Sequence, residues 1–264
     1  MRLTKHHGLG NDFLVLLDLD GLRPVGPDDA RAVCDRHTGI GADGLIRVTA
    51  GSGGADVTMH LLNSDGSRAE MSGNGIRCLA QAVLQAGVAQ PPEVRVMTDA
   101  GLRSVVVRDR TGPDTHLLSV DMGAAKVGDD EPDWLGDDII RAVRVDMGNP
   151  HLVLHVPDRQ WGPDVAELGR QIDAATPGGL NVHLLSPGDA TGEIIISTWE
   201  RGAGATLACG TGACAAAAAA LVWDLAGPRV TVHMPGGSAE VEIGETVTLI
   251  GPATSIAIFD WPWP

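Results

Sequence analysis

A cysteine stands directly before a glycine-rich turn at residues 208–212, whose sequence is Ala-Cys-Gly-Thr-Gly. Glycines there let the backbone turn sharply and leave amide N–H groups unobstructed at the start of a helix. Those amides, together with the helix dipole, form an anion site suited to a carboxylate. The same field is expected to lower the pKa of the Cys209 thiol, because positive potential favours the thiolate. The turn therefore predicts a reactive thiolate beside a carboxylate-binding site rather than an inert buried cysteine.

A similar turn, with serine in place of cysteine, lies in the first half of the chain. Residues 72–75 (Ser-Gly-Asn-Gly) match residues 209–212 (Cys-Gly-Thr-Gly) at an offset of 137. Two other segments repeat at an offset of 138: residues 10–16 return as 148–154, and residues 41–43 return as 179–181. Segments that repeat in register predict two similar halves, each presenting one turn that begins with a nucleophile-sized residue.

A polar segment introduces each turn. Residues 63–67 (Asn-Ser-Asp-Gly-Ser) precede the first turn, and Glu200 with Arg201 precedes the second. Arg201 suits a carboxylate, although a surface ion pair is the commoner use of an arginine, and Glu200 suits an ammonium group or a partner histidine. The pattern predicts two half-sites for one small ligand that carries carboxylate and ammonium groups.

A dinucleotide fingerprint is a competing interpretation of Gly210-x-Gly212-x-x-Ala215. It requires a strand that leads straight into the first glycine and an acidic residue about 20 positions further on. Residues 200–205 instead separate the preceding strand from the turn, and the region near position 230 reads Arg-Val-Thr. The interpretation as a nucleotide-binding fold is therefore weak.

Composition excludes several classes of function. The formal charge of −15 over 264 residues disfavours nucleic acid, whose phosphates would be repelled. No stretch reaches the roughly 20 apolar residues that a membrane span requires, and the first residues lack the apolar core of a signal peptide. Four cysteines without a Cys-x-x-Cys pair indicate neither a zinc site nor a disulfide framework. We expect a cytoplasmic protein without a metal.

Strand-like runs alternate with two clear helices. The strands are expected at residues 13–17, 58–62, 93–97, 103–107, 152–156, 193–198 and 229–233, each rich in β-branched or aliphatic residues. Helices are expected at residues 75–86 and 212–225, directly after the two turns, and the second contains six consecutive alanines. A helix that is small and apolar on every face is a buried one. The predicted fold is α/β, with two halves that each wrap a strand-rich, barrel-like sheet around one central helix.

The expected domains are residues 1–115 with the returning tail 252–264, and residues 116–251. The segment at about 110–138 is rich in Gly, Asp and Pro and is expected to cross between the halves. A second loop is expected at residues 157–163. The tail at 251–264 contains two tryptophans near its end and is expected to pack back onto a domain.

Four groups of residues together identify a family. They are residues 8–13 (Gly-Leu-Gly-Asn-Asp-Phe), residues 63–67 with 73–78, residues 148–151 (Gly-Asn-Pro-His), and residues 200–204 with 208–214. On these motifs, which span nearly the whole chain, the sequence resembles the diaminopimelate epimerases, cofactor-independent amino-acid isomerases related to proline racemase. The resemblance implies two pseudo-symmetric halves closing on the substrate, usually in a homodimer. It also implies interconversion of LL- and meso-diaminopimelate in the synthesis of lysine and peptidoglycan precursors.

The resemblance also assigns roles to residues. Inverting a carbon centre without a cofactor needs one acid/base group on each face of Cα, and the family has cysteines at the positions of Ser72 and Cys209. His151 and Glu200 would tune the bases. The substrate would be held by Asn11, Asn63, Asn149, Asn181, Glu200 and Arg201, and its α-carboxylate by the amides of Gly73, Asn74, Gly210 and Thr211.

Ser72 is the main departure from the family pattern, because a hydroxyl is a far poorer acid and base than a thiol. Cys78 is no easy substitute, since six helical residues displace it by about 9 Å and turn it to another face. Three explanations stay open: an introduced Cys→Ser change, a natural epimerase that uses a hydroxyl or water, and a one-base relative such as a lyase or dehydratase. A silent amino-acid-binding protein on the same scaffold is a further alternative. Ala205 and Gly44 are smaller departures that concern loop packing or substrate detail.

Overall fold

The computed structural model describes residues 1–129, 138–157 and 164–262. The chain divides into two compact units. Unit 1 contains Met1–Asp121 and Gly251–Pro264, and unit 2 contains Met122–Ile250.

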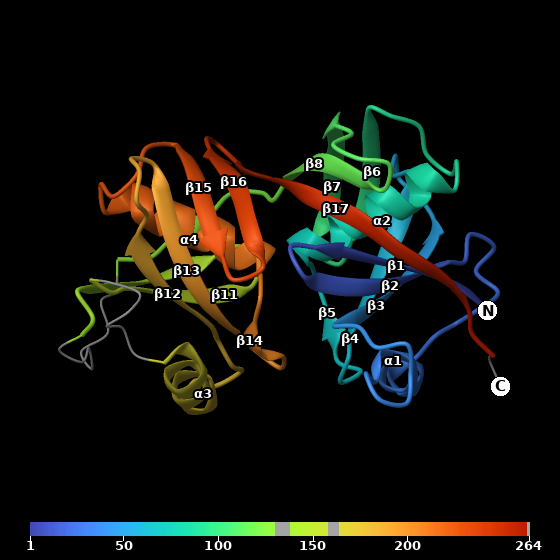
Figure 1. Cartoon of the computed structure of the whole chain (residues 1–264), viewed down its shortest axis with the longest axis horizontal. Helices are drawn as coiled ribbons and strands as arrows, with labels where there is room; N and C mark the ends of the chain where they lie inside the picture. Colours follow the sequence, from blue (N-terminus) through green and yellow to red (C-terminus); the bar gives the residue numbers. More distant parts are fainter. Residues whose placement is uncertain (130–137, 158–163, 263–264) are drawn as a thin grey trace. The chain divides into compact units, whose positions relative to one another are not determined.

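Unit 1 is a closed ring of strands around a helix (Figure 1). The ring runs in the order β1 (Arg2–Gly8), β2 (Asn11–Leu17), β3 (Gly44–Ala50), β4 (Val57–Asn63), β6 (Glu93–Thr98), β7 (Gly101–Asp109), β8 (Thr115–Asp121) and β17 (Val247–Asp260), which pairs again with β1. The short β5 (Arg68–Ala69) pairs with β4. Helix α2 (Gly73–Gln85) is buried inside the ring over residues 73–83, and α1 (Pro27–Cys34) packs on the outside.

Unit 2 repeats this arrangement. Its strands follow the order β9 (Lys126–Val127), β10 (Arg141–Asp146), β11 (Pro150–His155), β12 (Asn181–Pro187), β13 (Glu193–Glu200), β15 (Arg229–Met234), β16 (Gly237–Ile243) and the first residues of β17. Hydrogen bonds from Met122 N to Val247 O and from Val247 N to Gly123 O, both 2.8 Å, join β17 to the segment that leads into β9. Helix α4 (Gly210–Val222) lies inside, α3 (Val165–Ala175) packs against β12 and β13, and β14 (Gly204–Thr206) pairs with β13.

The two enclosed helices confirm the predicted fold class, and they begin two residues earlier than predicted. The side chains of Ser72 and Cys209 cap α2 and α4, so the glycines that follow them already belong to the helices. Helix α4 ends at Val222, three residues before the predicted end, because Asp224 has a left-handed backbone with φ of 57°. The small alanines explain why α4 can be buried on every side: residues 210–220 are all enclosed.

All seven predicted strands coincide with observed strands, but the expected crossover at 110–138 is only partly a loop. It contains β8 and β9, and residues 130–137 of it lie outside the described residues. The expected loop at 157–163 also lies outside them, apart from its first residue. The tail does pack back: Gly251–Asp260 is the second part of β17, and Trp261 contacts the core of unit 1. Residues 263–264 are not described.

Strand pairing corrects one part of the predicted repeat. Residue Phe13 lies opposite Gly44 in the parallel pair β2–β3, and its match His151 lies opposite Asn181 in the pair β11–β12. Asn181 therefore occupies the place of Gly44, an offset of 137, whereas the sequence comparison matched it with Asp43. A one-residue shift moves a side chain to the other face of a strand, so the correction changes which residues are equivalent.

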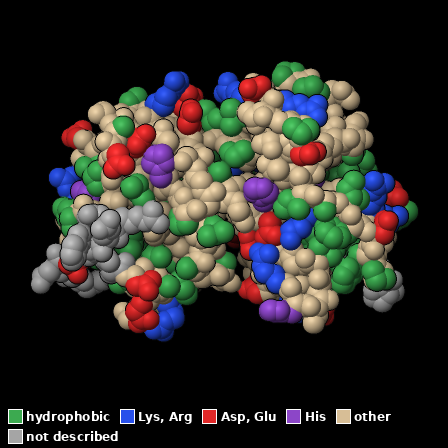
Figure 2. All heavy atoms as spheres, viewed as in Figure 1, with side chains coloured by type: hydrophobic (Ala, Val, Ile, Leu, Met, Phe, Trp, Pro, Cys, Tyr) green, Lys and Arg blue, Asp and Glu red, His purple; other side chains and the backbone are tan. Residues whose placement is uncertain are grey.

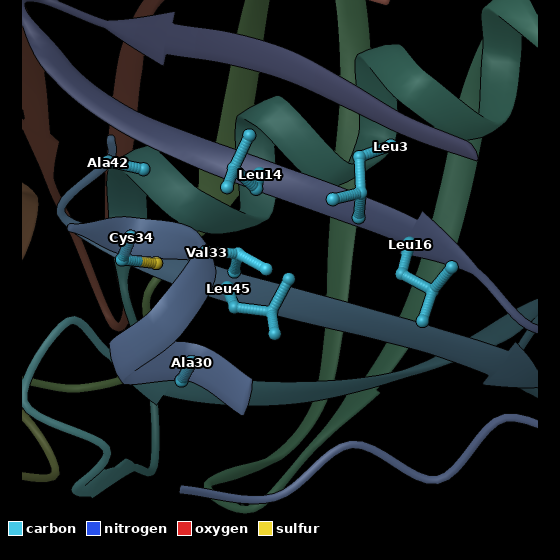
Figure 3. Packing of buried hydrophobic residues seen from close by; sticks show 8 residues of the cluster. All are labelled: Leu3, Leu14, Leu16, Ala30, Val33, Cys34, Ala42 and Leu45. Carbon is cyan, nitrogen blue, oxygen red and sulfur yellow. The ribbon is translucent and has the colours of Figure 1, made fainter. Parts of the chain in front are cut away.

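The core of unit 1 continues on the outer side of the ring, where α1 packs. Figure 3 shows this cluster, which comprises Leu3, Leu14, Leu16, Ala30, Val33, Cys34, Ala42 and Leu45. Five consecutive residues of β2 are buried because α2 covers one of its faces and α1 the other. The strand that begins at Asn11 is thereby held on both sides.

On the face shown in Figure 2, Lys and Arg side chains lie singly or in small groups beside Asp and Glu. In the described part of the chain, the helices are all too short or too polar to cross a membrane.

The packing of α4 leads to a prediction about stability. Ala217 is fully buried, and Ala217→Leu adds three carbons where strands surround the helix. We expect a loss of about 1–3 kcal/mol in the free energy of unfolding, because an overpacked core must shift. Denaturation by urea measures it. Val222→Leu, at a position 59% exposed on the same helix, is the control and should change stability by less than about 0.5 kcal/mol. Equal stability of Ala217→Leu and the parent chain would contradict the enclosed helix.

Candidate active site

Ser72 is the N-cap of α2, and its side chain is tied to the start of the helix. The Gly75 amide N–H donates to Ser72 Oγ at 3.0 Å. The cap has an extended backbone, with φ of −141° and ψ of 121°. A Cβ on Gly75 would lie 3.3 Å from Ser72 Oγ and 3.2 Å from its Cβ, so the close approach depends on glycine. The predicted glycine-rich helix start is thus present, with the hydroxyl attached to it.

Cys209 occupies the same position in unit 2. The Gly212 amide N–H donates to Cys209 Sγ at 3.3 Å, and the cap backbone is again extended, with φ of −126° and ψ of 115°. The Thr211 hydroxyl lies 3.5 Å from the sulfur. Each unit therefore holds the reactive atom of its turn by the amide three residues further on.

The predicted lowering of the Cys209 pKa is wrong for this structure. Burial raises the pKa of the thiol well above its ordinary value of 9.0, and the charge of Glu200 raises it further. Hydrogen bonds from Thr211 and from the Gly212 amide lower the pKa, but by less. Desolvation outweighs the helix start because the cysteine is only 3% exposed. Cys209 is accordingly a thiol at neutral pH.

The polar residues predicted around Cys209 lie on neighbouring strands of unit 2. Glu200, the last residue of β13, hydrogen-bonds to Cys209 and accepts the Thr206 hydroxyl proton at 2.6 Å. The Arg201 amide donates to Asn181 Oδ1 at 3.0 Å, which joins the end of β13 to the start of β12. The Arg201 guanidinium is exposed and donates to Gly178 O at 3.0 Å. Glu200, Arg201, Asn181 and Cys209 are thus brought together.

His151 belongs to a buried row of polar side chains. Its Nε2 lies 2.9 Å from Asn149 Oδ1, and its Nδ1 lies 2.8 Å from Nε2 of His183. His183 Nδ1 lies 3.1 Å from Thr198 Oγ1. Burial lowers the pKa of His183 to about 3, and it lowers the pKa of His151 well below 6.5, so both imidazoles are neutral at physiological pH. The row reaches the Cys209 turn through His183, whose ring lies against Gly212.

Two predicted residues of unit 1, Asn11 and Asn74, belong to a separate chain of hydrogen bonds. Arg77 Nη2 donates to Asn74 Oδ1 at 2.7 Å, Asn74 Nδ2 to Asn11 Oδ1 at 3.1 Å, and Asn11 Nδ2 to Asp43 Oδ2 at 2.7 Å. Asn74 and Arg77 are buried, so this chain anchors the first turn of α2. Asn63 lies apart from it, at the end of β4, where its Nδ2 donates to Ser67 Oγ at 3.0 Å.

The two units differ behind their helix starts. Ile46 of unit 1 contacts the Gly75 position, where unit 2 has His183 against Gly212. Phe13 of unit 1 and His151 of unit 2 also occupy matching positions on their strands. The Ser72 turn therefore rests on the Ile46 side chain, and the Cys209 turn rests on the His183 imidazole.

Sequence reasoning missed three residues that organise these sites: Asp43, Arg77 and His183. Arg77 and His183 are fully buried in spite of their polarity, and Asp43 binds Asn11. The repeat itself carried a signal for His183, since a histidine stands where the first half has Ile46. Among the described residues, no group of three or more His, Cys, Asp or Glu side chains could hold a metal ion.

The sequence profile described as "Diaminopimelate epimerase" matches residues 3–128 and 143–255. The chain belongs to this family. The diaminopimelate epimerase of Heliobacterium modesticaldum is 38% identical over 97% of this chain and 98% of its own length. The diaminopimelate epimerase of Pelotomaculum thermopropionicum is 39% identical over 100% of this chain and 99% of its own length.

Solved structures share the fold of this member of the diaminopimelate epimerase family. A hydroxyproline epimerase from Agrobacterium vitis superimposes with a TM-score of 0.73 over 98% of this chain and 91% of its own, at 19% identity. A protein of Pseudomonas aeruginosa described as a predicted epimerase superimposes with a TM-score of 0.75 over 100% of this chain and 99% of its own, at 16% identity. At these identities the likeness establishes the fold alone.

The raised thiol pKa can be measured directly. The thiolate absorbs at 240 nm, and the difference in absorbance between the parent chain and Cys209→Ser reports the Cys209 thiolate. We expect this difference to develop only above pH 9, because burial and Glu200 favour the neutral thiol. Glu200→Gln removes the carboxylate charge and should shift this titration to lower pH. The double variant Glu200→Gln/Cys209→Ser is the control and should lose the shifted signal. A Cys209 thiolate already present at pH 7.5 would contradict the effect of burial.

Proposed function

We propose that this chain is a cofactor-independent diaminopimelate epimerase that interconverts LL- and meso-diaminopimelate by moving a proton at Cα. The observation that carries the proposal is the matched pair of helix starts, in which Ser72 Oγ and Cys209 Sγ each accept the amide N–H three residues ahead. Relatives about 38% identical over nearly their full length bear this enzyme's name. An isomerase that needs two equivalent groups explains why the chain repeats such a turn.

The proposed chemistry assigns one acid/base group to each face of Cα. When Cys209 acts as the acid, its S–H bond breaks and the proton goes to the Cα carbanion, leaving a thiolate. When it acts as the base, the thiolate takes the Cα proton and the electron pair stays on carbon. The raised pKa makes Cys209 a ready acid in the free protein, and it must first lose its proton to act as a base.

We assign the second position to the Ser72 hydroxyl and propose that this face limits the rate. A hydroxyl holds its proton far more tightly than a thiol, so removal of the Cα proton on this side is slower. The Gly75 amide stabilises negative charge that develops on Oγ. The surroundings offer little more, because Ile46 lies beside this turn where unit 2 has a histidine.

In the proposed complex, the residues that the family resemblance named bind the polar groups of the substrate. Amides at the starts of α2 and α4, from Gly73, Asn74, Gly210 and Thr211, are the proposed α-carboxylate donors. Asn11, Asn63, Asn149, Asn181, Glu200 and Arg201 are the proposed contacts for the remaining groups. The hydrogen bond from the Arg201 amide to Asn181 supports a shared role for these two residues.

We further propose that the enzyme works as a cytoplasmic homodimer in the synthesis of lysine and peptidoglycan precursors. All four cysteines are free, as is usual for proteins of a reducing compartment. Size-exclusion chromatography with light scattering tests the dimer, for which a mass near twice 27.4 kDa is expected. A monomer mass with full activity would overturn that part.

Hydrogen exchange at Cα in D₂O tests the reaction. Starting separately from LL- and meso-diaminopimelate, we expect both isomers to take up deuterium at Cα and to interconvert, more slowly than a two-thiol relative assayed beside it. Exchange without inversion would point to one-base chemistry, and loss of water or ammonia to a lyase or dehydratase. Tight binding without exchange would indicate an amino-acid-binding protein. Each of these three results would refute the proposal.

Removing the thiol tests the role of Cys209. Cys209→Ser should lower kcat by about 10²–10⁴-fold, the usual contribution of a positioned acid or base. Cys34→Ala is the matched control, since Cys34 is also a buried thiol but lies in the outer cluster of unit 1. Its kcat should stay within a few-fold of the parent value. Equal losses in both variants would show that the effect of Cys209→Ser is structural.

Restoring a thiol tests the role of Ser72. Ser72→Cys should raise kcat by at least about tenfold, because a thiol transfers protons near neutral pH more readily than a hydroxyl. Ser72→Ala serves as the control and should abolish inversion. If Ser72→Cys gave no gain while Ser72→Ala kept full activity, position 72 would have no part in proton transfer.

A further inference from the structure

The buried row in unit 2 has a direction that follows from its end group. Asn149 presents its Oδ1 to His151 Nε2 at 2.9 Å, and an amide oxygen only accepts hydrogen bonds. His151 Nε2 must therefore carry the proton. Because the ring is neutral, its Nδ1 is an acceptor, and the donor is Nε2 of His183 at 2.8 Å.

The hydrogen bond at the other end of the row, between His183 and Thr198, also has a fixed direction. His183 is neutral and protonated on Nε2, so its Nδ1 accepts the Thr198 hydroxyl proton at 3.1 Å. Protons are thus donated in one direction, from Thr198 through His183 and His151 to Asn149. Each imidazole gives one hydrogen bond and accepts one, which satisfies both buried rings.

The direction of these hydrogen bonds determines the orientation of the Asn149 side-chain amide. With Oδ1 held by His151, its NH₂ group is turned away from the row, and Asn149 is the partly exposed member. The NH₂ group is a donor and suits a carboxylate oxygen. If His151 changed tautomer, Nε2 would become an acceptor and would favour the flipped amide, which presents an oxygen and would repel a carboxylate.

His183 also contacts the turn that carries the thiol. A Cβ on Gly212 would lie 2.2 Å from His183 Cε1 and within 2.9 Å of both ring nitrogens. Gly212 is the residue whose amide donates to Cys209 Sγ. One imidazole therefore supports the helix start and directs the row that ends at Asn149.

Packing alone does not require these imidazoles. Unit 1 has Phe13 and Ile46 at the matched positions, and it forms the same ring and the same helix start. Burying two imidazoles in unit 2 carries a desolvation cost that an apolar pair avoids. The polar pair occurs in the unit that holds Cys209.

We propose that His183 is a positioning residue for the reaction: its Nε2–H fixes the tautomer of His151 and thereby turns the Asn149 NH₂ group toward a carboxylate of the substrate. The proposal rests on the proposed function for the identity of that substrate. It adds a residue to which the sequence analysis assigned no role.

The first test uses the unaltered chain and does not depend on activity. Long-range ¹⁵N–¹H NMR spectra at pH 7, assigned with His151→Gln and His183→Gln variants, report the protonated nitrogen of each ring. We expect His151 and His183 to be neutral and protonated on Nε2. A proton on Nδ1 of either ring would overturn the proposal.

The second test is a double-mutant cycle on the kinetics with diaminopimelate. His183→Ile, which copies the matched Ile46, should raise KM about tenfold, the value of one hydrogen bond, with a smaller change in kcat. Asn149→Ala should raise KM similarly, and the double variant should be no worse than Asn149→Ala alone, because both act through one contact. Additive effects on KM would overturn the proposal.

His155→Leu is the matched control for loss of a buried histidine. His155 lies on β11 like His151, but it stacks on Trp223 and lies outside the row. Its variant should lose stability and keep the parent KM, whereas an equal rise in KM would assign the effect of His183→Ile to general loosening of unit 2. If the parent chain does not epimerise diaminopimelate, the proposed function fails, and the NMR result still decides the tautomers.

Discussion

A single type of hydrogen bond fixes the chemistry of this protein to its fold. In each unit, the amide three residues into an enclosed helix donates to the side chain that caps that helix. The helix cannot turn or slide, because strands surround it for its first eleven residues. The atoms Oγ of Ser72 and Sγ of Cys209 therefore take their positions from a closed ring of strands and not from a loop. A reactive group that must meet one carbon atom benefits from this rigidity.

The same enclosure that fixes the thiol also changes its acidity. A helix start favours a thiolate, yet burial raises the Cys209 pKa by more than the amide and the Thr211 hydroxyl lower it. The neighbouring carboxylate acts in the same direction as burial. The protein therefore keeps this sulfur protonated at neutral pH, which also protects it from oxidation, since thiolate is the reactive form.

Much of the fold could be predicted because the repeat and the residue types agree. Six alanines after a glycine turn specify a buried helix, and β-branched runs specify seven of the strands. Strands such as β1 and β12 were missed because polar residues, among them His6 and His183, interrupt their apolar runs. At the site, the two capping residues were found from the turns alone. The Cys209 pKa was predicted in the wrong direction, because burial by strands distant in sequence cannot be read from the turn. Arg77 was missed because the predicted helix began at residue 75 and so left out its partner Asn74. His183 was missed because its partner His151 is 32 residues away in the sequence and meets it only through the pairing of β11 with β12.

Strand β17 closes both rings, so the ring of unit 1 stays open until the end of the chain has been synthesised. Its first residues pair with β16 in unit 2, and its later residues pair with β1 and β8 in unit 1. Until residues 251–260 leave the ribosome, β1 and β8 are both open edges, although all other strands of unit 1 were synthesised more than a hundred residues earlier. Open edges invite pairing with other chains. The first half to be synthesised is thus completed last, and a chain truncated before its final strand would leave exposed the edges that a complete molecule hides.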